Sequence, residues 1–231
     1  MSCKAKIAAA AATFALAAGG LGMLGTLSAS AATPKCGSKC QDLYTKKFGP
    51  RYLLATFPRK AAANQEVILS RAAKNNPAED FVIKNLGSVG SMYGQHQRVI
   101  TPQFDTSYAA LSAYEFQYAP HGVISNLCLG TGPGQVAQAG FKVRLEPCGK
   151  HRNSVWAIFT GQFVRDHTTS GYDVLISAAT NSLADPLVLN YPAGNPAKMP
   201  SPWLNLQPLR ATANKTIVNN QQWAYRNGPV R

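Results

Sequence analysis

The sequence is poor in acidic residues, and this scarcity argues against most carboxylate chemistry. Only 10 residues are Asp or Glu, against 23 Lys and Arg. Glu79 and Asp80 are the only adjacent acidic pair, and neighbours along a strand point to opposite faces. The four histidines stand apart from one another in the sequence. We therefore predict no catalytic residues and no enzyme activity. A hydrolase that assembles two carboxylates from distant positions is the alternative.

Motifs for metals, cofactors and nucleic acids are missing as well. The cysteines form no C-x-x-C motif and accompany no H-x-x-x-H pair, so no metal site is expected. The glycine-rich stretch 130–134 contains Pro133 and precedes no helical pattern, which favours a turn over a phosphate-binding loop. Basic residues are scattered, with dense groups only at Lys46-Lys47-Arg51, Arg59-Lys60 and Lys150-His151-Arg152. We thus expect no cofactor and no specific nucleic-acid partner, and we attribute the positive charge to solubility.

The sequence has one long apolar run, and it lies at the N-terminus. Two lysines precede an uncharged stretch from residue 7 to residue 27, which leads into Ala29-Ser30-Ala31. A basic start, an apolar centre and an A-x-A site are the parts of a secretory signal peptide. We predict that residues 1–31 are cleaved and that 32–231 form one secreted, extracellular, monomeric domain. A membrane anchor is disfavoured because the run is mostly Ala and Gly and no basic stop-transfer cluster follows.

Cleavage would leave four cysteines and 21 basic against 10 acidic residues, a net charge of +11. An even number of cysteines in an exported chain indicates two disulfides. The most economical pairing joins neighbours, Cys36 with Cys40 and Cys128 with Cys148. Two other connectivities remain open.

Helical patterns are rare in the mature chain, where prolines and glycines recur and few windows hold a 3.6-residue apolar period. Only 41–48 or 106–116 could form a helical turn or two. Three segments instead share one pattern: an apolar strand, a turn, a second strand, a polar loop, and a third strand that opens with an aromatic residue. The pattern predicts an all-β fold with repeats at about 40–83, 120–158 and 172–225. The strands begin at Tyr52, Val67 and Phe81, at Leu127, Val143 and Trp156, and at Leu187, Trp203 and Trp223.

Residues of the second and third repeats resemble a known family. Leu127-Cys128-Leu129, Leu145-Glu146-Pro147-Cys148 and Trp156 resemble the ricin-type lectin repeat of the β-trefoil fold, and Gln221-Gln222-Trp223 matches its Q-x-W signature. Secreted actinobacterial proteins commonly contain such domains. The resemblance implies a pseudo-threefold β-trefoil and a disulfide between Cys128 and Cys148. It also implies that the anchors Phe81, Trp156 and Trp223 share one core.

The resemblance also implies where a sugar would bind. A sugar pocket of this family needs an acid just after the Cys-Leu pair, an aromatic residue just before the second Cys, and an Asn shortly before the Q-x-W Trp. The first repeat has Ala55, Ser70 and Ala78 in these places and keeps none of the three. The second repeat has Gly130 and Glu146 and keeps only Asn153.

The third repeat is better equipped. Asn190 and Gln207 stand in the places of the acid and the aromatic residue, and Tyr191 or Trp203 could supply a stacking face. In the alternative interpretation Trp203 and Trp223 belong to the core, Gln221 bonds to the backbone, and the asparagines serve turns. We predict a degenerate carbohydrate site made of Asn190, Tyr191, Asn205, Gln207, Asn220 and Gln221.

Residues 84–118 depart from the repeat. From Phe81 to Leu129 is 48 residues, whereas Trp156 to Leu189 is 33. Long loops on a β scaffold often bind partners, so a secreted protein-binding or inhibitor trefoil acting through this loop is the rival function. In the competing interpretation the loop packs its aromatic side chains Tyr108, Tyr114 and Phe116 over the barrel.

Overall fold

The computed structural model describes residues 35–56, 61–72, 80–95, 101–132, 137–149, 152–159, 161–163, 166–180 and 185–227. All of them belong to one compact unit, Thr33–Arg231. The predicted signal peptide, 1–31, lies outside the described residues. None of the described helices is long and apolar enough to span a membrane.

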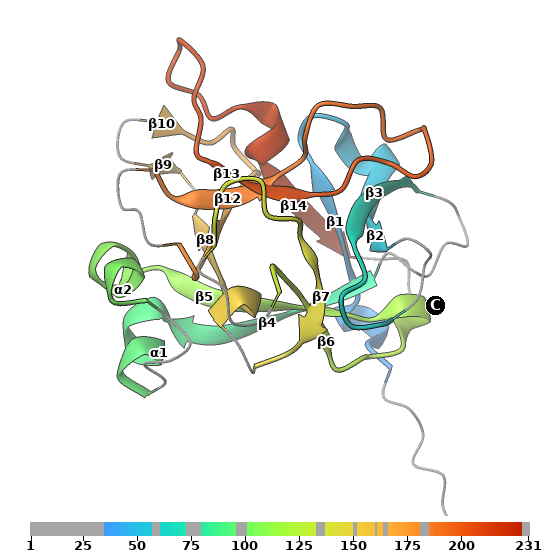
Figure 1. Ribbon diagram of the computed structural model, residues 1–231, viewed down its shortest axis with the longest axis horizontal. Helices are drawn as coiled ribbons and strands as arrows, with labels where there is room; N and C mark the ends of the chain where they lie inside the picture. The colour runs from blue at the N-terminus through green and yellow to red at the C-terminus, as the bar shows by residue number, and fades with distance from the viewer. Residues whose placement is uncertain are drawn as a thin grey trace, which may run out of the picture. The chain divides into compact units, whose positions relative to one another are not determined.

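The main strands fall into three groups of four (Figure 1). Two of these strands, β11 and β12, are buried at every residue, as their short apolar runs indicate. The first group is β1 (Gln41–Thr45), β2 (Tyr52–Thr56), β3 (Val67–Arg71) and β4 (Asp80–Ser88). The second is β5 (Ser112–Tyr118), β6 (Leu127–Gly130), β7 (Arg144–Pro147) and β8 (Trp156–Phe159). The third is β11 (Val174–Ser177), β12 (Leu187–Asn190), β13 (Asn205–Pro208) and β14 (Trp223–Asn227).

Shorter elements connect these strands. The helices α1 (Val89–Gln95) and α2 (Pro102–Tyr108) lie between β4 and β5. A small separate hairpin of β9 (Gln162–Phe163) and β10 (Asp166–His167) lies between β8 and β11. Single 3-10 turns are η1 (Gly37–Lys39), η2 (Gly49–Arg51), η4 (Pro120–Gly122), η5 (Arg152–Ser154) and η6 (Asn219–Gln221).

The first and fourth strands of each group form a closed barrel. The antiparallel neighbours run in the order β14, β1, β4, β5, β8, β11. Asp173, next to β11, bridges Trp223 of β14, with Asp173 N donating to Trp223 O (2.7 Å) and Trp223 N to Asp173 O (2.8 Å). The last strand therefore returns to the neighbourhood of β11, and the barrel has no open edge there.

The second and third strands of each group form the hairpins β2–β3, β6–β7 and β12–β13. A closed ring of backbone hydrogen bonds joins them. Val67 N donates to Val143 O (3.0 Å), Val143 N to Leu204 O (2.8 Å), and Leu204 N to Val67 O (2.8 Å). Each repeat contributes one residue at the same place, as a pseudo-threefold axis requires. The fold is the predicted all-β trefoil.

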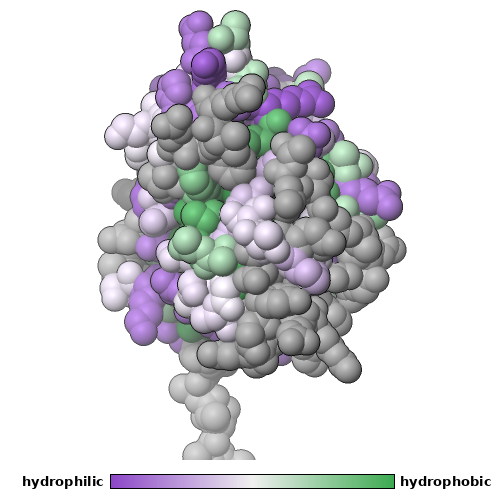
Figure 2. Space-filling view, turned by 90° about the vertical axis from the view of Figure 1, so that its left-hand side faces the viewer, coloured by the Kyte–Doolittle hydropathy of each residue, from purple (hydrophilic) through white to green (hydrophobic). Residues whose placement is uncertain are grey.

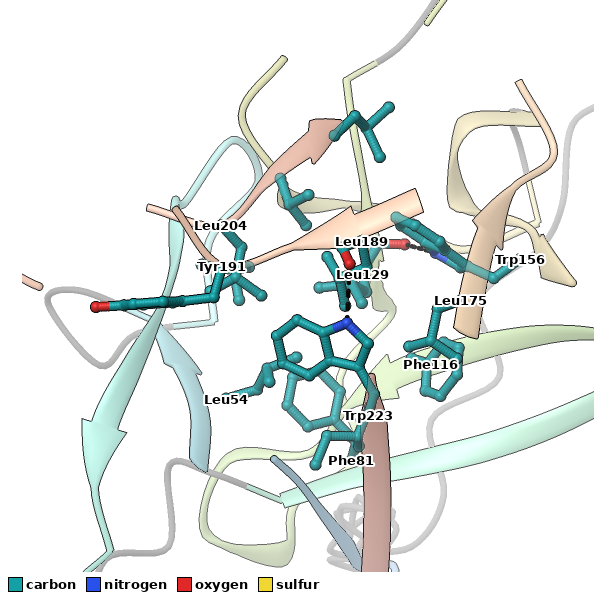
Figure 3. Packing of buried hydrophobic residues seen from close by; sticks show 14 of the residues in the cluster. Leu54, Phe81, Phe116, Leu129, Trp156, Leu175, Leu189, Tyr191, Leu204 and Trp223 are labelled. Atoms are coloured by element: carbon teal, nitrogen blue, oxygen red, sulfur yellow. Dashed lines mark hydrogen bonds between the residues drawn. The ribbon is translucent and has the colours of Figure 1, made fainter. Parts of the chain in front are cut away.

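The aromatic anchors lie in one shared core, as predicted (Figure 3). Trp156 Nε1 donates to Leu129 O (2.9 Å), and Trp223 Nε1 donates to Leu189 O (2.8 Å). The second and third repeats thus contain the same indole-to-carbonyl bond. Phe81 occupies the corresponding place in the first repeat and has no donor.

Both disulfides of the economical pairing are present. Cys36 is bonded to Cys40, and Cys128 of β6 is bonded to Cys148, which directly follows β7. A carboxylate oxygen of Glu115 lies within 4.8 Å of the sulfurs of Cys128 and Cys148. These sulfurs are not available as thiolate ligands because they are bonded to each other.

The segment 84–118 is not one loop, which corrects the expectation. β4 extends to Ser88 and β5 begins at Ser112, so only the helix pair and its connections are inserted. The second repeat accordingly starts at β5, before residue 120, and Phe116 is a buried barrel residue. The stretch 41–48, considered as a helical turn, contains β1. On the face where α1, α2, β9 and β10 lie, Figure 2 shows apolar residues near the middle and hydrophilic residues toward the rim.

Candidate functional site

Four of the predicted site residues line one pocket of the third repeat. Asn190 ends β12, Asn205 and Gln207 lie on β13, and Asn220 lies in η6. The pocket has a volume of about 430 Å³, within the usual range for small-molecule sites. Its other lining residues are Lys47, Pro192, Ala193, Arg210 and Val218.

The asparagines form a chain of amide hydrogen bonds. Asn220 Nδ2 donates to Asn190 Oδ1 (2.8 Å), and Asn190 Nδ2 donates to Asn205 Oδ1 (2.8 Å). The pairing of Asn190 with Asn205 follows from the strand register, which places the two directly opposite. Within the described residues, no hydrogen bond engages Asn205 Nδ2 or Asn220 Oδ1. These two asparagines therefore leave one donor group and one acceptor atom available to a ligand.

The turn η6 holds this pocket together. Asn219 O accepts hydrogen bonds from Lys47 N (3.2 Å) and Thr45 Oγ1 (3.1 Å), which attaches the end of β1 and the turn that follows it. Asn220 O accepts a bond from Tyr191 N (3.0 Å), just after β12. Segments that are far apart in the sequence thus meet on three consecutive residues.

Gln221 is part of that scaffold and does not line the pocket. Its side chain is fully buried, its Oε1 accepts a bond from Arg210 N (2.8 Å), and its Nε2 donates to Pro208 O (2.9 Å). The alternative interpretation, in which Gln221 bonds to the backbone, is therefore correct, and the assignment of Gln221 as a ligand-binding residue is wrong.

Tyr191 is not a stacking face either. Its side chain is fully buried in the main core (Figure 3). Its hydroxyl lies 3.3 Å from Ser201 Oγ, and its ring centroid lies 5.2 Å from that of Phe48. Burial raises the pKa of the Tyr191 hydroxyl. The aromatic ring is occupied by core packing, so the prediction of Tyr191 as a ligand residue is wrong.

Trp203 differs from both expectations. It is 42% exposed and so is not a core residue, and it does not line the third-repeat pocket. Lys142 Nζ lies 3.1 Å from the centroid of the Trp203 ring. The Trp203 indole therefore forms a cation–π contact with Lys142.

Lys47 and Arg210 are the pocket residues that sequence reasoning missed. Lys47 was noted only as part of a basic group, and it reaches the third repeat because β1 pairs with β14 in the barrel. Arg210 follows β13 outside any motif. A repeat alignment compares equivalent positions, so it does not show contacts between different repeats.

In the second repeat, the side chain of Glu146 fills the space that is equivalent to the open pocket of the third repeat. Glu146 Oε1 accepts a hydrogen bond from Thr131 N (3.0 Å), and a Cβ added to Gly130 would lie only 1.5 Å from that oxygen. Burial of Glu146 raises its pKa from the ordinary 4.5 to about 7. Asn153 is also buried, and its Nδ2 donates to Gly132 O. Glu146 thus takes the space that Gly130 leaves open.

A second pocket, of about 530 Å³, lies beside this filled position and is lined by Asn64, Thr131, Phe141, Lys142 and Arg144 among others. The carboxylate of Glu66 pairs with two cations of this pocket. Glu66 Oε1 lies 2.9 Å from Lys142 Nζ and 3.8 Å from Arg144 Nη2. In the first repeat Ala55 and Ser70 are buried, and Ala78 lies outside the described residues.

No protein-family model matches the chain, and a comparison with curated proteins finds no similar sequence. Solved structures do match. ThreeFoil, a designed threefold symmetric protein, has a TM-score of 0.50 at 13% identity, covering 81% of this chain and 97% of ThreeFoil. A mosquitocidal holotoxin has a TM-score of 0.52 at 11% identity, covering 83% of this chain and 17% of the toxin. An exo-β-1,3-galactanase from Clostridium thermocellum has a TM-score of 0.54 at 9% identity, covering 83% of this chain and 30% of the enzyme.

The chain therefore spans a small part of the last two proteins and nearly all of the first. At these identities the likeness establishes a shared trefoil fold. Function has to be argued from the site itself.

Proposed function

We propose that this protein is a secreted, non-catalytic binding protein of the ricin B-like class, and that it binds carbohydrate through the third-repeat pocket. The chain of three asparagines, with Gln207 beside it in an open pocket, carries the proposal. Amide groups donate and accept hydrogen bonds side by side, as sugar hydroxyls do, so the two match in kind.

The composition of the pocket supports binding rather than catalysis. Its described lining contains no Asp, Glu, His, Ser or Cys. Lys47 is the one described residue there of a type that acts as a general base or nucleophile, and the lining holds no acid–base partner to activate it. Glu146, whose pKa is raised to about 7, is packed against Gly130 in another repeat. A ligand in the third-repeat pocket would be held without covalent chemistry, by the polar and charged side chains of the lining.

The rival function, protein binding through 84–118, has less support. Val89 and Met92 of α1 and Phe104 and Tyr108 of α2 are buried in a second hydrophobic cluster. Across the described part of this segment, no large apolar side chain is exposed. Because these aromatic residues are used for packing, the described side chains of the segment offer no anchor of the kind that dominates protein interfaces.

A glycan array probed with the mature protein tests the proposal. We expect binding to at least one glycan class, lost in Asn220→Ala and weakened in Gln207→Ala, because both side chains line the pocket. Asn219→Ala is the matched control, since Asn219 is exposed and lies outside the lining. Gln207→Ala removes no hydrogen bond found between described residues, so it separates binding from folding. No binding to any glycan, or equal loss in Asn219→Ala, would contradict the proposal.

A further inference from the structure

We infer that the saccharide taken by the third-repeat pocket is acidic, and that Lys47 and Arg210 receive its carboxylate or sulfate group. The inference rests on the proposed carbohydrate binding and adds the class of sugar. It starts from the two cations in the lining, neither of which the degenerate sugar motif contains.

The charge of this pocket is unbalanced. Lys47 and Arg210 line it together, and the described lining contains no acidic side chain. Within the described residues, neither cation forms a salt bridge. In the second pocket, by contrast, Glu66 pairs with Lys142 and Arg144. Two cations with no counter-charge at one pocket favour an anion between them.

Backbone contacts hold both cations at the pocket. Lys47 N donates to Asn219 O (3.2 Å) and to Thr45 Oγ1 (3.0 Å). Arg210 N donates to Gln221 Oε1 (2.8 Å), and Arg210 O accepts a bond from Val218 N (3.1 Å). The cations come from different repeats, yet both are tied to the turn of Asn220. These bonds use main-chain atoms of Lys47 and Arg210, so side-chain substitutions would leave the pocket wall in place.

The asparagine chain favours a sugar over a bare anion or a nucleic acid. A fully ionised inorganic anion only accepts hydrogen bonds, so it would leave the acceptor Asn220 Oδ1 unmatched. A sugar ring carries hydroxyls that donate to Asn220 Oδ1 and accept from Asn205 Nδ2. The net charge of +11 expected for the mature chain, from 21 basic and 10 acidic residues, attracts any polyanion. At physiological salt that attraction is screened beyond about 8 Å, so the groups in the pocket decide selectivity.

Calorimetric titration of the mature protein at about 0.15 M ionic strength tests the inference with paired probes. The pairs are trigalacturonate and its methyl ester, and galactose 6-sulfate and galactose. A single-stranded oligonucleotide serves as a non-sugar polyanion. We expect at least one acidic member to bind about tenfold or more tightly than its neutral partner, given the strength of hydrogen bonds to charged groups. The pair that shows the preference identifies the anionic group.

Substitutions of the two pocket cations test whether they cause the preference for an acidic sugar. Lys47→Gln and Arg210→Gln should each lower the ratio of acidic-probe affinity to neutral-probe affinity about tenfold, because each removes one charge that only the acidic probe engages. Lys84→Gln removes the same charge at an exposed residue outside both pockets and should change neither.

Each contrary result has its own meaning. Equal binding of acidic and neutral probes, insensitive to both pocket variants, overturns the acidic preference and leaves carbohydrate binding intact. Oligonucleotide binding as tight as the best sugar overturns it in favour of general attraction to polyanions. No binding of any saccharide overturns both proposals.

Discussion

Glu146 and Gln207 hold equivalent places in the second and third repeats. The residue that ends the neighbouring strand determines whether the side chain is buried or lines an open pocket. The strand β6, which pairs with the strand of Glu146, ends in Gly130, whose missing side chain leaves room for the carboxyl group. The strand β12, which pairs with the strand of Gln207, ends in Asn190, whose side chain occupies that space, and Gln207 stays half-buried on the pocket wall. A glycine at one strand end therefore decides whether the site is filled by the chain or open to a ligand.

The buried carboxyl of Glu146 makes stability depend on pH. Its pKa of about 7 in the folded protein exceeds the ordinary 4.5, so between these values the folded state binds more protons than the unfolded state. The free energy of unfolding therefore falls as pH rises from about 4.5 to about 7, by on the order of 3 kcal/mol in total. Glu146→Gln stays neutral and should lose this slope.

Urea unfolding at about pH 4 and about pH 8 measures the effect. The variant should match the parent at the lower pH and be more stable at the higher pH. An identical pH slope in both proteins would mean that Glu146 is not buried as a neutral acid.

Elements differ in how far the sequence predicts them. The hairpins were predictable because strands such as Leu187-Val188-Leu189 are short apolar runs bounded by turn residues. The first strand of each repeat was missed. Gln41–Thr45, Ser112–Tyr118 and Val174–Ser177 share no common apolar pattern, so a comparison of the repeats does not find them. The helix pair between β4 and β5 was missed because its helices are only one to two turns long.

The site was predictable to the same extent as the hairpins that form it. Asn190, Asn205 and Gln207 lie on β12 and β13, where motif positions and strand register coincide. Tyr191 lies one residue beyond β12, where the chain turns into the core, and a motif cannot show that change of direction. Lys47 comes from another repeat and was not assigned to the site.

The disulfide of the β6–β7 hairpin should stabilise the protein more than the disulfide between Cys36 and Cys40. Cys128 and Cys148 are 20 residues apart, whereas Cys36 and Cys40 are 4 apart. In the chain-entropy model the longer loop contributes on the order of 3 kcal/mol and the shorter one less. Cys128→Ser/Cys148→Ser should therefore lower the melting temperature more than Cys36→Ser/Cys40→Ser, which is the matched control. Equal losses in calorimetry would contradict this ranking.

At the scale of the whole molecule, the threefold plan was the most predictable feature. Leu54 and Leu129 are 75 residues apart, as are Phe81 and Trp156, because core positions tolerate little change while loops absorb insertions. The ring through Val67, Val143 and Leu204 was not predictable, because it joins backbones. Side-chain patterns do not show which carbonyl an amide will meet.

A core shared by three repeats should make them unfold together. Phe81, Trp156 and Trp223 are buried in the same cluster, so truncating any one to Ala leaves a large cavity and should cost about 3 to 5 kcal/mol. All three variants should melt at similarly lowered temperatures in one transition, with circular dichroism and fluorescence coinciding. Trp203→Ala, at an exposed tryptophan outside this cluster, should melt close to the parent. If Trp223→Ala also melted like the parent, the third repeat would not depend on the common core, and the open pocket would stand on a separately stable unit.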